Sequence, residues 1–262
     1  MDIKILVATH KKYWMPSDDV YLPLHVGREG KVDLGYIGDN TGDNISAKNV
    51  NYCELTGLYW AWKNLKCDYI GLCHYRRYFS SSDSIHTIEV YKNFNDIEQY
   101  IITKEEYKKL LKRYDIIVPV KSFLDGMTVE EQYENAHNIR DLIKCEEIIG
   151  EFYPEYQNTF RQIMQEKTFY PCNMFVTKKE YFDDYMNWLF NILFELEKRI
   201  DISDYDNYQR RIYGFLSERL FNVWLAKNNF NIKEERILFI RELGMNKYYR
   251  HKIEKFFKDL FK

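Results

Sequence analysis

The chain has 262 residues and a formal net charge of −2, and 45% of its residues are hydrophobic and 30% charged, a composition typical of a folded globular protein. The near-neutral charge argues against a nucleic-acid partner, because no basic field is present to attract phosphates. No apolar run approaches the ~18 residues that cross a bilayer. Residues 2–7 form a strand pattern too short for a signal peptide, and the five scattered cysteines fit a reducing compartment. The sequence therefore predicts a cytoplasmic protein.

Short apolar runs alternate along the chain with segments of helical periodicity. Strands are expected at residues 3–8, 34–37, 68–79, 114–119 and 171–177, and helices at 44–62, 104–113, 128–150, 179–199 and 212–228. Residues 13–35 contain Pro and Gly and are expected to be irregular. Strands that alternate with helices predict an α/β fold, a three-layer sandwich around a mainly parallel central sheet.

Residues 246–262 differ in composition from the rest of the chain. Six Lys and Arg stand there against two acidic residues, and apolar residues recur at i, i+4, i+7, i+8 and i+11. This pattern predicts a C-terminal amphipathic helix with a basic face, a composition typical of helices that lie on membranes. The alternative is a terminal helix packed on the domain with its charged face in solvent. We therefore divide the chain into a domain at 1–245 and a tail at 246–262.

The strand expected at 68–79 ends in a cluster of cationic and aromatic side chains. His74, Arg76 and Arg77 follow its apolar half, and ligands of α/β sheets bind outside the carboxyl ends of strands. Two adjacent guanidinium groups favour an anion such as a phosphate. This pattern predicts a site for a phosphorylated or nucleotide-linked ligand. The equal alternative is that one Arg pairs with a carboxylate and the other is solvated.

Several longer motifs resemble a bacterial family labelled as a domain of unknown function, whose members occur in capsule, exopolysaccharide and O-antigen gene clusters. The residues that carry this resemblance are Asn44–Asn49, Tyr52–Thr56, Tyr59–Asn64, Cys73–Phe79, Asn173–Phe175, Trp188–Phe190, Leu196–Glu197 and Gly214–Leu220. The family looks like GT-A glycosyltransferases, and its characterised members are β-galactofuranosyltransferases. The resemblance covers roughly residues 3–240.

The resemblance implies an inverting glycosyltransferase of bacterial surface polysaccharide synthesis. The enzyme would move a sugar, galactofuranose by preference, from a UDP-sugar to a glycan or undecaprenyl-linked acceptor at the inner face of the cell membrane. Two alternatives stay open. One is a galactopyranosyl or other hexosyl transferase, and the other is a nucleotide- or carbohydrate-binding module without catalysis.

The family comparison also bears on metal dependence. Many GT-A enzymes carry an Asp-x-Asp motif for a divalent metal where this chain has Cys73–Arg77. We expect no metal requirement, with Arg76 and Arg77 stabilising the negative charge of the leaving UDP. Strand alternation would direct one of the two toward the core, and a requirement for Mn²⁺ or Mg²⁺ stays open as the alternative.

The same resemblance implies a donor pocket at the ends of the first strands. Thr9, His10 and Lys11 follow the first strand and would contact the base and phosphates, and an ordinary surface role is the equal alternative for a Lys or His there. The other candidates for donor binding are Asp39, Asn44, Ser46 and Asn49, which lie in a Gly-flanked turn and at the helix start that follows it. Such turns are more often plain turns.

Inversion at an anomeric carbon needs one carboxylate that takes the proton of the attacking hydroxyl. Glu218 lies where GT-A enzymes place this base, at a late helix, and Arg219 beside it would keep it ionised. The local sequence alone favours an ordinary surface Glu–Arg pair. His137 and Asp141 stand four residues apart on an expected helix and would line the acceptor side. A surface pair is the alternative for them.

Overall fold

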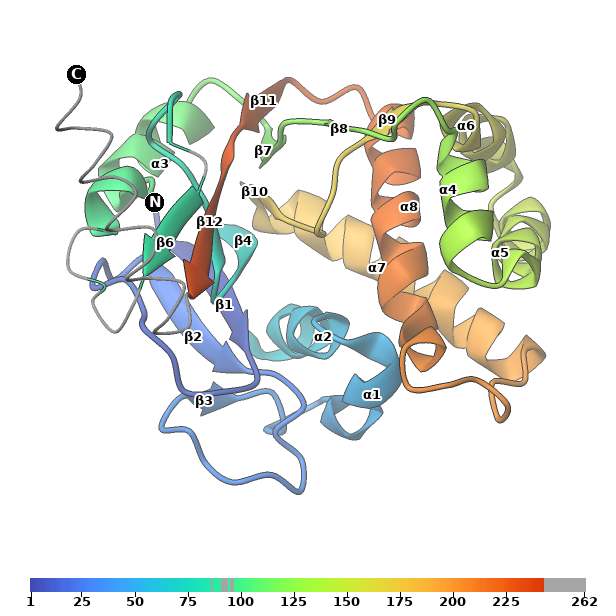
Figure 1. Ribbon diagram of the computed structural model, residues 1–262, viewed down its shortest axis with the longest axis horizontal. Helices are drawn as coiled ribbons and strands as arrows, with labels where there is room; N and C mark the ends of the chain where they lie inside the picture. Colours follow the sequence, from blue (N-terminus) through green and yellow to red (C-terminus); the bar gives the residue numbers. More distant parts are fainter. Residues whose placement is uncertain (86, 91–93, 95–96, 243–262) are drawn as a thin grey trace, which may run out of the picture.

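The central sheet of the protein is mixed but mainly parallel, as Figure 1 shows. The computed structural model describes residues 1–85, 87–90, 94 and 97–242. The sheet runs in the order β11-β7-β10-β4-β1-β2-β3. These strands are β1 (Ile3–Thr9), β2 (Tyr21–His25), β3 (Ile37–Gly38), β4 (Tyr69–His74), β7 (Ile116–Pro119), β10 (Phe175–Lys178) and β11 (Ile232–Glu235). Only β10 runs antiparallel to its neighbours within this order.

The strands at the centre form because their sequences are apolar without interruption. Six of the seven residues of β1 are buried, and Ile70–Cys73 of β4 are buried as well. Such runs are typical of strands covered on both faces. Gly71 is needed in β4, because a Cβ there would lie 2.6 Å from the carbonyl oxygen of Phe175 on the neighbouring strand. The close approach of β4 and β10 therefore depends on a residue without a side chain.

Two hydrophobic cores lie on opposite faces of the sheet. One packs Leu6, Leu72 and Ile116 against the helices, and the other packs Ile5, Cys73 and Ile117 against the opposite layer. The first layer contains α1 (Asn49–Tyr52), α2 (Leu55–Asn64), α4 (Val129–Ala136), α5 (Ile139–Phe152), α6 (Pro154–Met164), α7 (Lys179–Arg199) and α8 (Ile212–Lys227). The second contains α3 (Lys104–Leu111), β5 (Arg77–Phe79), β6 (Thr87–Val90) and β12 (Ile237–Glu242). The expected three-layer α/β sandwich is confirmed.

Short elements connect these layers. They are the 3₁₀ helices η1 (Ser46–Lys48), η2 (Glu98–Tyr100) and η3 (Gln209–Arg211), and the two-stranded sheet of β8 (Ser122–Phe123) and β9 (Thr168–Phe169). In Figure 1, α8 runs beside α4 and α6, while α1 and α2 approach its N-terminal end. The N-terminal end of α8 therefore lies beside the segment that connects η1 to α2.

Four expected elements are interrupted where the backbone turns. The strand expected at 68–79 breaks after His74, and β5 folds back so that Arg77 pairs with His74. The helix at 44–62 is split at Cys53, which has a φ of 52°, and the helix at 128–150 is split at His137, which is extended. The strand at 171–177 begins only at Phe175, because Cys172 and Asn173 have positive φ.

Some elements were not expected, or were expected wrongly. The expectation that residues 13–35 are irregular is wrong at β2, and β11, β12 and α6 were not expected. The predicted amphipathic helix at 246–262 lies outside the described residues, so the division into 1–245 and 246–262 stays a prediction. Within the described part of the chain, no helix is long and apolar enough to cross a membrane.

The contact at Gly71 gives a prediction for stability. Gly71→Ala forces a methyl group against the backbone of β10, and we expect the free energy of unfolding to fall by about 1–3 kcal/mol. Gly150→Ala in α5 is the control, because its Cβ would meet only the movable end of Gln157 and alanine favours the helix by about 0.5–1 kcal/mol. Urea unfolding measures both, and an unchanged stability of Gly71→Ala would contradict the close approach.

Candidate active site

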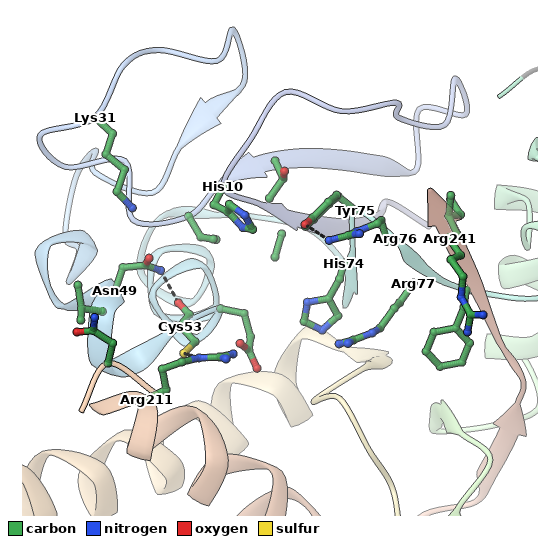
Figure 2. A pocket seen from close by; sticks show the side chains of 18 of the residues that line it. His10, Lys31, Asn49, Cys53, His74, Tyr75, Arg76, Arg77, Arg211 and Arg241 are labelled. Atoms are coloured by element: carbon green, nitrogen blue, oxygen red, sulfur yellow. Dashed lines mark hydrogen bonds between the residues drawn. The ribbon is translucent and has the colours of Figure 1, made fainter. Parts of the chain in front are cut away.

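A cavity of about 1210 Å³ opens at the carboxyl ends of β1 and β4. Parallel strands bring these two ends to the same edge of the sheet, which is where α/β proteins bind ligands. Its walls come from segments far apart in the sequence, and the residues that line it include Thr9, His10, Lys31, Asn49, Cys53, Glu54, His74, Tyr75, Arg76, Arg77, Asn207, Arg211 and Arg241. Figure 2 shows these regions around one space, with Lys31 extending from the loop that follows β2.

The lining is strongly cationic. It holds Lys31, Arg76, Arg77, Arg211 and Arg241, whereas Glu54 is the one acidic residue among the described residues of the lining. In Figure 2, the Arg77 and Arg211 guanidinium groups extend toward the same part of the cavity from opposite sides. Clustered guanidinium groups favour an anion with several oxygens, since each presents a planar fork of donors. The cavity is therefore suited to a phosphorylated ligand.

The arginines differ in their partners within the described residues. Arg76 donates to the hydroxyl of Tyr75 (2.7 Å), and Arg241 lies 3.7 Å from the carboxylate of Glu89. Arg211 donates from Nε to Cys53 Sγ (3.3 Å). Arg77 is exposed and makes no ion pair with any described residue. Of the two adjacent arginines, Arg77 is thus the one left free for a ligand.

Burial favours the neutral form of both histidines of the cavity. Burial lowers the pKa of His10, and the charges of Lys11, Lys31 and Arg76 lower it further. Burial also lowers the pKa of His74, although Glu54 nearby acts in the opposite direction. Nε2 of His74 lies 2.9 Å from the carbonyl oxygen of Cys172 and therefore donates its proton to it. This bond fixes the tautomer of His74.

Six of the site residues expected from the sequence meet in this cavity, namely Thr9, His10, Asn49, His74, Arg76 and Arg77. The Thr9 hydroxyl donates to the carbonyl oxygen of Lys11 (2.6 Å). The side-chain nitrogen Nδ2 of Asn49 donates to the backbone carbonyl oxygen of Cys53 (2.7 Å). Lys11 does not line the cavity, and its ammonium group lies 3.6 Å from Glu242 and over the ring of Tyr75.

Asp39, Asn44 and Ser46 lie behind the cavity wall. The carboxylate of Asp39 is fully buried and accepts hydrogen bonds from the backbone N–H groups of Gly27 and Arg28 and from the hydroxyls of Ser46 and Thr56. Asn44 accepts from the N–H of Ser46. These contacts hold the start of the loop that carries Lys31. Asp39, Asn44 and Ser46 therefore have partners within the protein, and none of the three lines the cavity.

Glu218 lies on α8, next to the cavity but outside its lining. One oxygen accepts from the backbone N–H of Cys172 (3.1 Å), and the other lies 3.4 Å from Nη1 of Arg219. Burial raises the pKa of Glu218, and the charge of Glu54 adds to the shift, while Arg219 acts against both. We expected Arg219 to keep this carboxylate ionised, but burial raises the pKa of Glu218 by more than Arg219 lowers it.

His137 and Asp141 do not line the cavity either. His137 stacks on Phe215 with ring centroids 3.9 Å apart, and its Nδ1 lies 3.2 Å from Oε1 of Gln209. Asp141 accepts a hydrogen bond from the hydroxyl of Tyr205 (2.8 Å). Both therefore fix the segment at 205–209, which is continuous with Asn207 and Arg211 of the lining. Their contribution to an acceptor site would be indirect.

Several lining residues were not among the expected site residues. Lys31, Cys53, Glu54, Asn207, Arg211 and Arg241 reach the cavity from segments that lie far apart in the sequence. Arg210 and Arg211 are two adjacent arginines, as Arg76 and Arg77 are, and they stand just before an expected helix. This pattern could have identified Arg211 as a candidate from the sequence. The part of the chain that the structure describes contains no group of three or more His, Cys, Asp or Glu side chains placed to hold a metal ion.

The fold and cavity define an α/β protein with a cationic cavity at the carboxyl edge of its sheet. The chain belongs to the family described as "Domain of unknown function (DUF4422)", whose model matches residues 4–229. Among solved structures it is similar to the "WbbM bifunctional glycosytransferase apo structure", with a TM-score of 0.86 and 32% sequence identity. That match covers 92% of this chain and 45% of the other, so this chain spans less than half of its length. A search of curated proteins finds no significant match.

The buried Asp141 gives a prediction for pH dependence. Burial raises its pKa to about 6 from an ordinary value near 3.8, so the folded state binds the proton more tightly than the unfolded state. Its contribution to stability is therefore present at low pH and lost as the pH rises through this range. We expect the stability of wild type relative to Asp141→Asn to fall by roughly 2–3 kcal/mol between about pH 4 and pH 7.

Urea unfolding of both proteins across this pH range measures the difference. The asparagine keeps an oxygen that accepts the Tyr205 hydroxyl, so the comparison isolates the ionisation. Glu155→Gln, a change at an exposed residue near the start of α6, is the control and should follow wild type at every pH. A constant difference between wild type and Asp141→Asn would contradict the raised pKa.

Proposed function

We propose that this protein is a glycosyltransferase that uses a nucleotide-diphosphate sugar as donor. The observation that carries the proposal is the cationic cavity at the carboxyl ends of β1 and β4, in a chain whose fold matches that of a glycosyltransferase structure. A diphosphate carries several negative charges, and a cavity with five Lys and Arg against one Glu complements them. A protein of this charge distribution is suited to hold such a donor.

The leaving diphosphate would be stabilised by arginine side chains. Charge develops on the phosphate oxygens as the glycosidic bond breaks, and fixed cations in a cavity stabilise this charge in the transition state. Arg77 lacks an ion-pair partner among the described residues, and Arg76 and Arg211 stand around the same cavity. We therefore propose catalysis that requires no metal ion, with Thr9 and His10 beside the nucleotide.

The choice of sugar and acceptor rests on the family resemblance. It favours galactofuranose carried by UDP and an acceptor that is a glycan or an undecaprenyl-linked glycan of a bacterial surface polysaccharide. The acceptor would approach from the side of Asn207 and Arg211, with His137 and Asp141 supporting that wall. A hexopyranosyl transferase and a binding module without catalysis are the alternatives that the experiment below separates.

An inverting transfer requires a carboxylate beside the acceptor hydroxyl. Glu218 stays the prediction made from the sequence, and it lies directly behind the cavity wall. Glu54 lies in the wall itself. Substitution of each by Gln distinguishes the two.

Turnover without added metal tests the proposed donor chemistry. We expect the protein to release UDP from one member of a panel of UDP-sugars, UDP-galactofuranose included, with a galactoside acceptor in EDTA. Arg77→Gln should lower kcat by about 10²–10³-fold, because one stabilising charge is lost from the transition state. Arg113→Gln, whose side chain does not line the cavity, should leave turnover unchanged. Activity that disappears in EDTA and returns with manganese would contradict the arginine mechanism.

The basic tail gives a prediction for membrane binding. We propose that residues 246–262 attach the enzyme peripherally to the inner face of the cell membrane, because Lys and Arg beside an apolar stripe bind anionic lipid surfaces. Vesicles that contain an anionic phospholipid should float the full chain but not residues 1–245. Equal flotation of the two forms would contradict the attachment.

A further inference from the structure

We propose that Glu54 is the general base of the reaction and that Asn173 positions it. The inference rests on the proposed function and adds to it the residue that accepts the proton of the attacking hydroxyl. Glu54 is the acidic residue of the described cavity lining, whereas Glu218 lies outside that lining. A general base must come within hydrogen-bond distance of the hydroxyl that it deprotonates. Of the two carboxylates, only Glu54 faces the space that a ligand can enter.

The backbone presents Glu54 to the cavity. Cys53 adopts a φ of 52° and a ψ of −130°, which ends α1, and α2 starts two residues later at Leu55. If the helix continued without a break through Cys53, Glu54 would lie on the surface of that helix. The interruption instead leaves it at the junction of the two helices, next to Cys53 and Asn49 in the cavity wall.

A buried amide holds one oxygen of Glu54. Nδ2 of Asn173 donates to Oε1 of Glu54 (2.8 Å) and to the hydroxyl of Ser217 (2.8 Å) on α8. Asn173 is only 2% exposed, and its Oδ1 is buried without a hydrogen-bond partner in the described structure. A buried amide with an unsatisfied oxygen lowers stability, so its retention beneath the cavity suggests a role in function.

The backbone is strained at the same place. The described residues contain four non-glycine residues with positive φ, and three of them are Cys53, Cys172 and Asn173. A positive φ at a residue with a side chain costs stability, and strain of this kind concentrates at functional sites. Of these three residues, Cys53 directly precedes Glu54, Asn173 donates a hydrogen bond to it, and Cys172 directly precedes Asn173.

The other oxygen of Glu54 is free to accept a proton. The hydrogen bond from Asn173 is the one that the described residues make to this carboxylate, and it goes to Oε1. Both oxygens of Glu218, in contrast, have partners in the Cys172 backbone N–H and Arg219. Glu218 therefore supports the turn at 172–173, while Oε2 of Glu54 remains available to a hydroxyl.

The histidines of the cavity are weaker candidates. His10 would gain a positive charge among Lys11, Lys31 and Arg76, which already lower its pKa. His74 uses Nε2 to donate to the Cys172 carbonyl, and burial disfavours its charged form. A carboxylate becomes neutral when it takes a proton, so Glu54 avoids this cost.

The reaction transfers the sugar from the diphosphate of the donor to the hydroxyl of the acceptor. The acceptor oxygen forms a bond to the anomeric carbon while the bond from that carbon to the diphosphate oxygen breaks. The electron pair of the broken bond leaves with UDP, whose charge Arg77 stabilises. The hydroxyl proton passes to Oε2 of Glu54, which later releases it to water.

Two isosteric variants test the assignment. We expect Glu54→Gln to lower kcat by about 10²–10⁴-fold while the dissociation constant for UDP, measured by calorimetry, stays within about threefold of wild type. Glu218→Gln should retain more than a tenth of wild-type turnover, because its carboxylate does not reach the ligand. Glu155→Gln on α6 is the surface control and should match wild type throughout.

A second variant separates a chemical role from a structural one. Glu54→Ala leaves room for a small carboxylate, so added formate should restore part of its turnover, whereas it should not improve wild type. Turnover of Glu54→Gln above a tenth of wild type overturns the assignment, as does failure of formate to rescue a folded Glu54→Ala. If wild type binds UDP but turns over no donor, the proposed function itself is wrong, and the role of Glu54 is overturned with it.

Discussion

The hydrogen bonds of one buried amide join the elements on which the cavity depends. Asn173 follows directly from the positive-φ residue Cys172, precedes β10, and reaches Glu54 at the α1–α2 junction and Ser217 on α8. Ser217 in turn donates to the carbonyl oxygen of Gly214. A sheet strand, a helix junction and a long helix are thereby fixed to one another below the ligand space. The position of the acidic group relative to the cations follows from this connection.

The second constraint is electrostatic. Arg76, Arg77 and Arg211 surround one space with a single carboxylate among the described lining residues, and like charges in such proximity repel one another. The protein relieves part of this repulsion through neutral partners, the Tyr75 hydroxyl for Arg76 and the Cys53 thiol for Arg211. An anionic ligand would relieve the remainder, so ligand binding and stability should be linked. Burial lowers the pKa of His10, and the charges of Lys11, Lys31 and Arg76 add to this shift.

The sequence predicted those parts of the fold that depend on continuous patterns. The apolar runs of β1 and β4 and the long periodicity of α7 identify the centre of the sandwich, and the Arg76–Arg77 pair identifies the cavity. Breaks at Cys53, Cys172 and Asn173 were missed, because cysteine gives no signal for positive φ and asparagine gives a weaker one than glycine. Those same breaks place Glu54, so the missed backbone features and the missed acidic residue have one cause.

Charge alone also could not separate lining residues from supporting ones. Asp39 and Lys31 both lie in the segment between β2 and η1, but Asp39 is buried with four donors while Lys31 extends into the cavity. The difference depends on how the loop folds on α2, which involves contacts distant in sequence. Arg211 and Arg241 likewise reach the cavity only through the tertiary fold.

The binding mode of UDP tests the central claim most directly. A crystal structure of the protein with UDP, prepared in EDTA, should show the diphosphate within hydrogen-bond distance of Arg77 at the carboxyl ends of β1 and β4, with Glu54 facing the adjacent open space. UDP bound elsewhere on the protein, or a diphosphate held away from these arginines, would contradict the account.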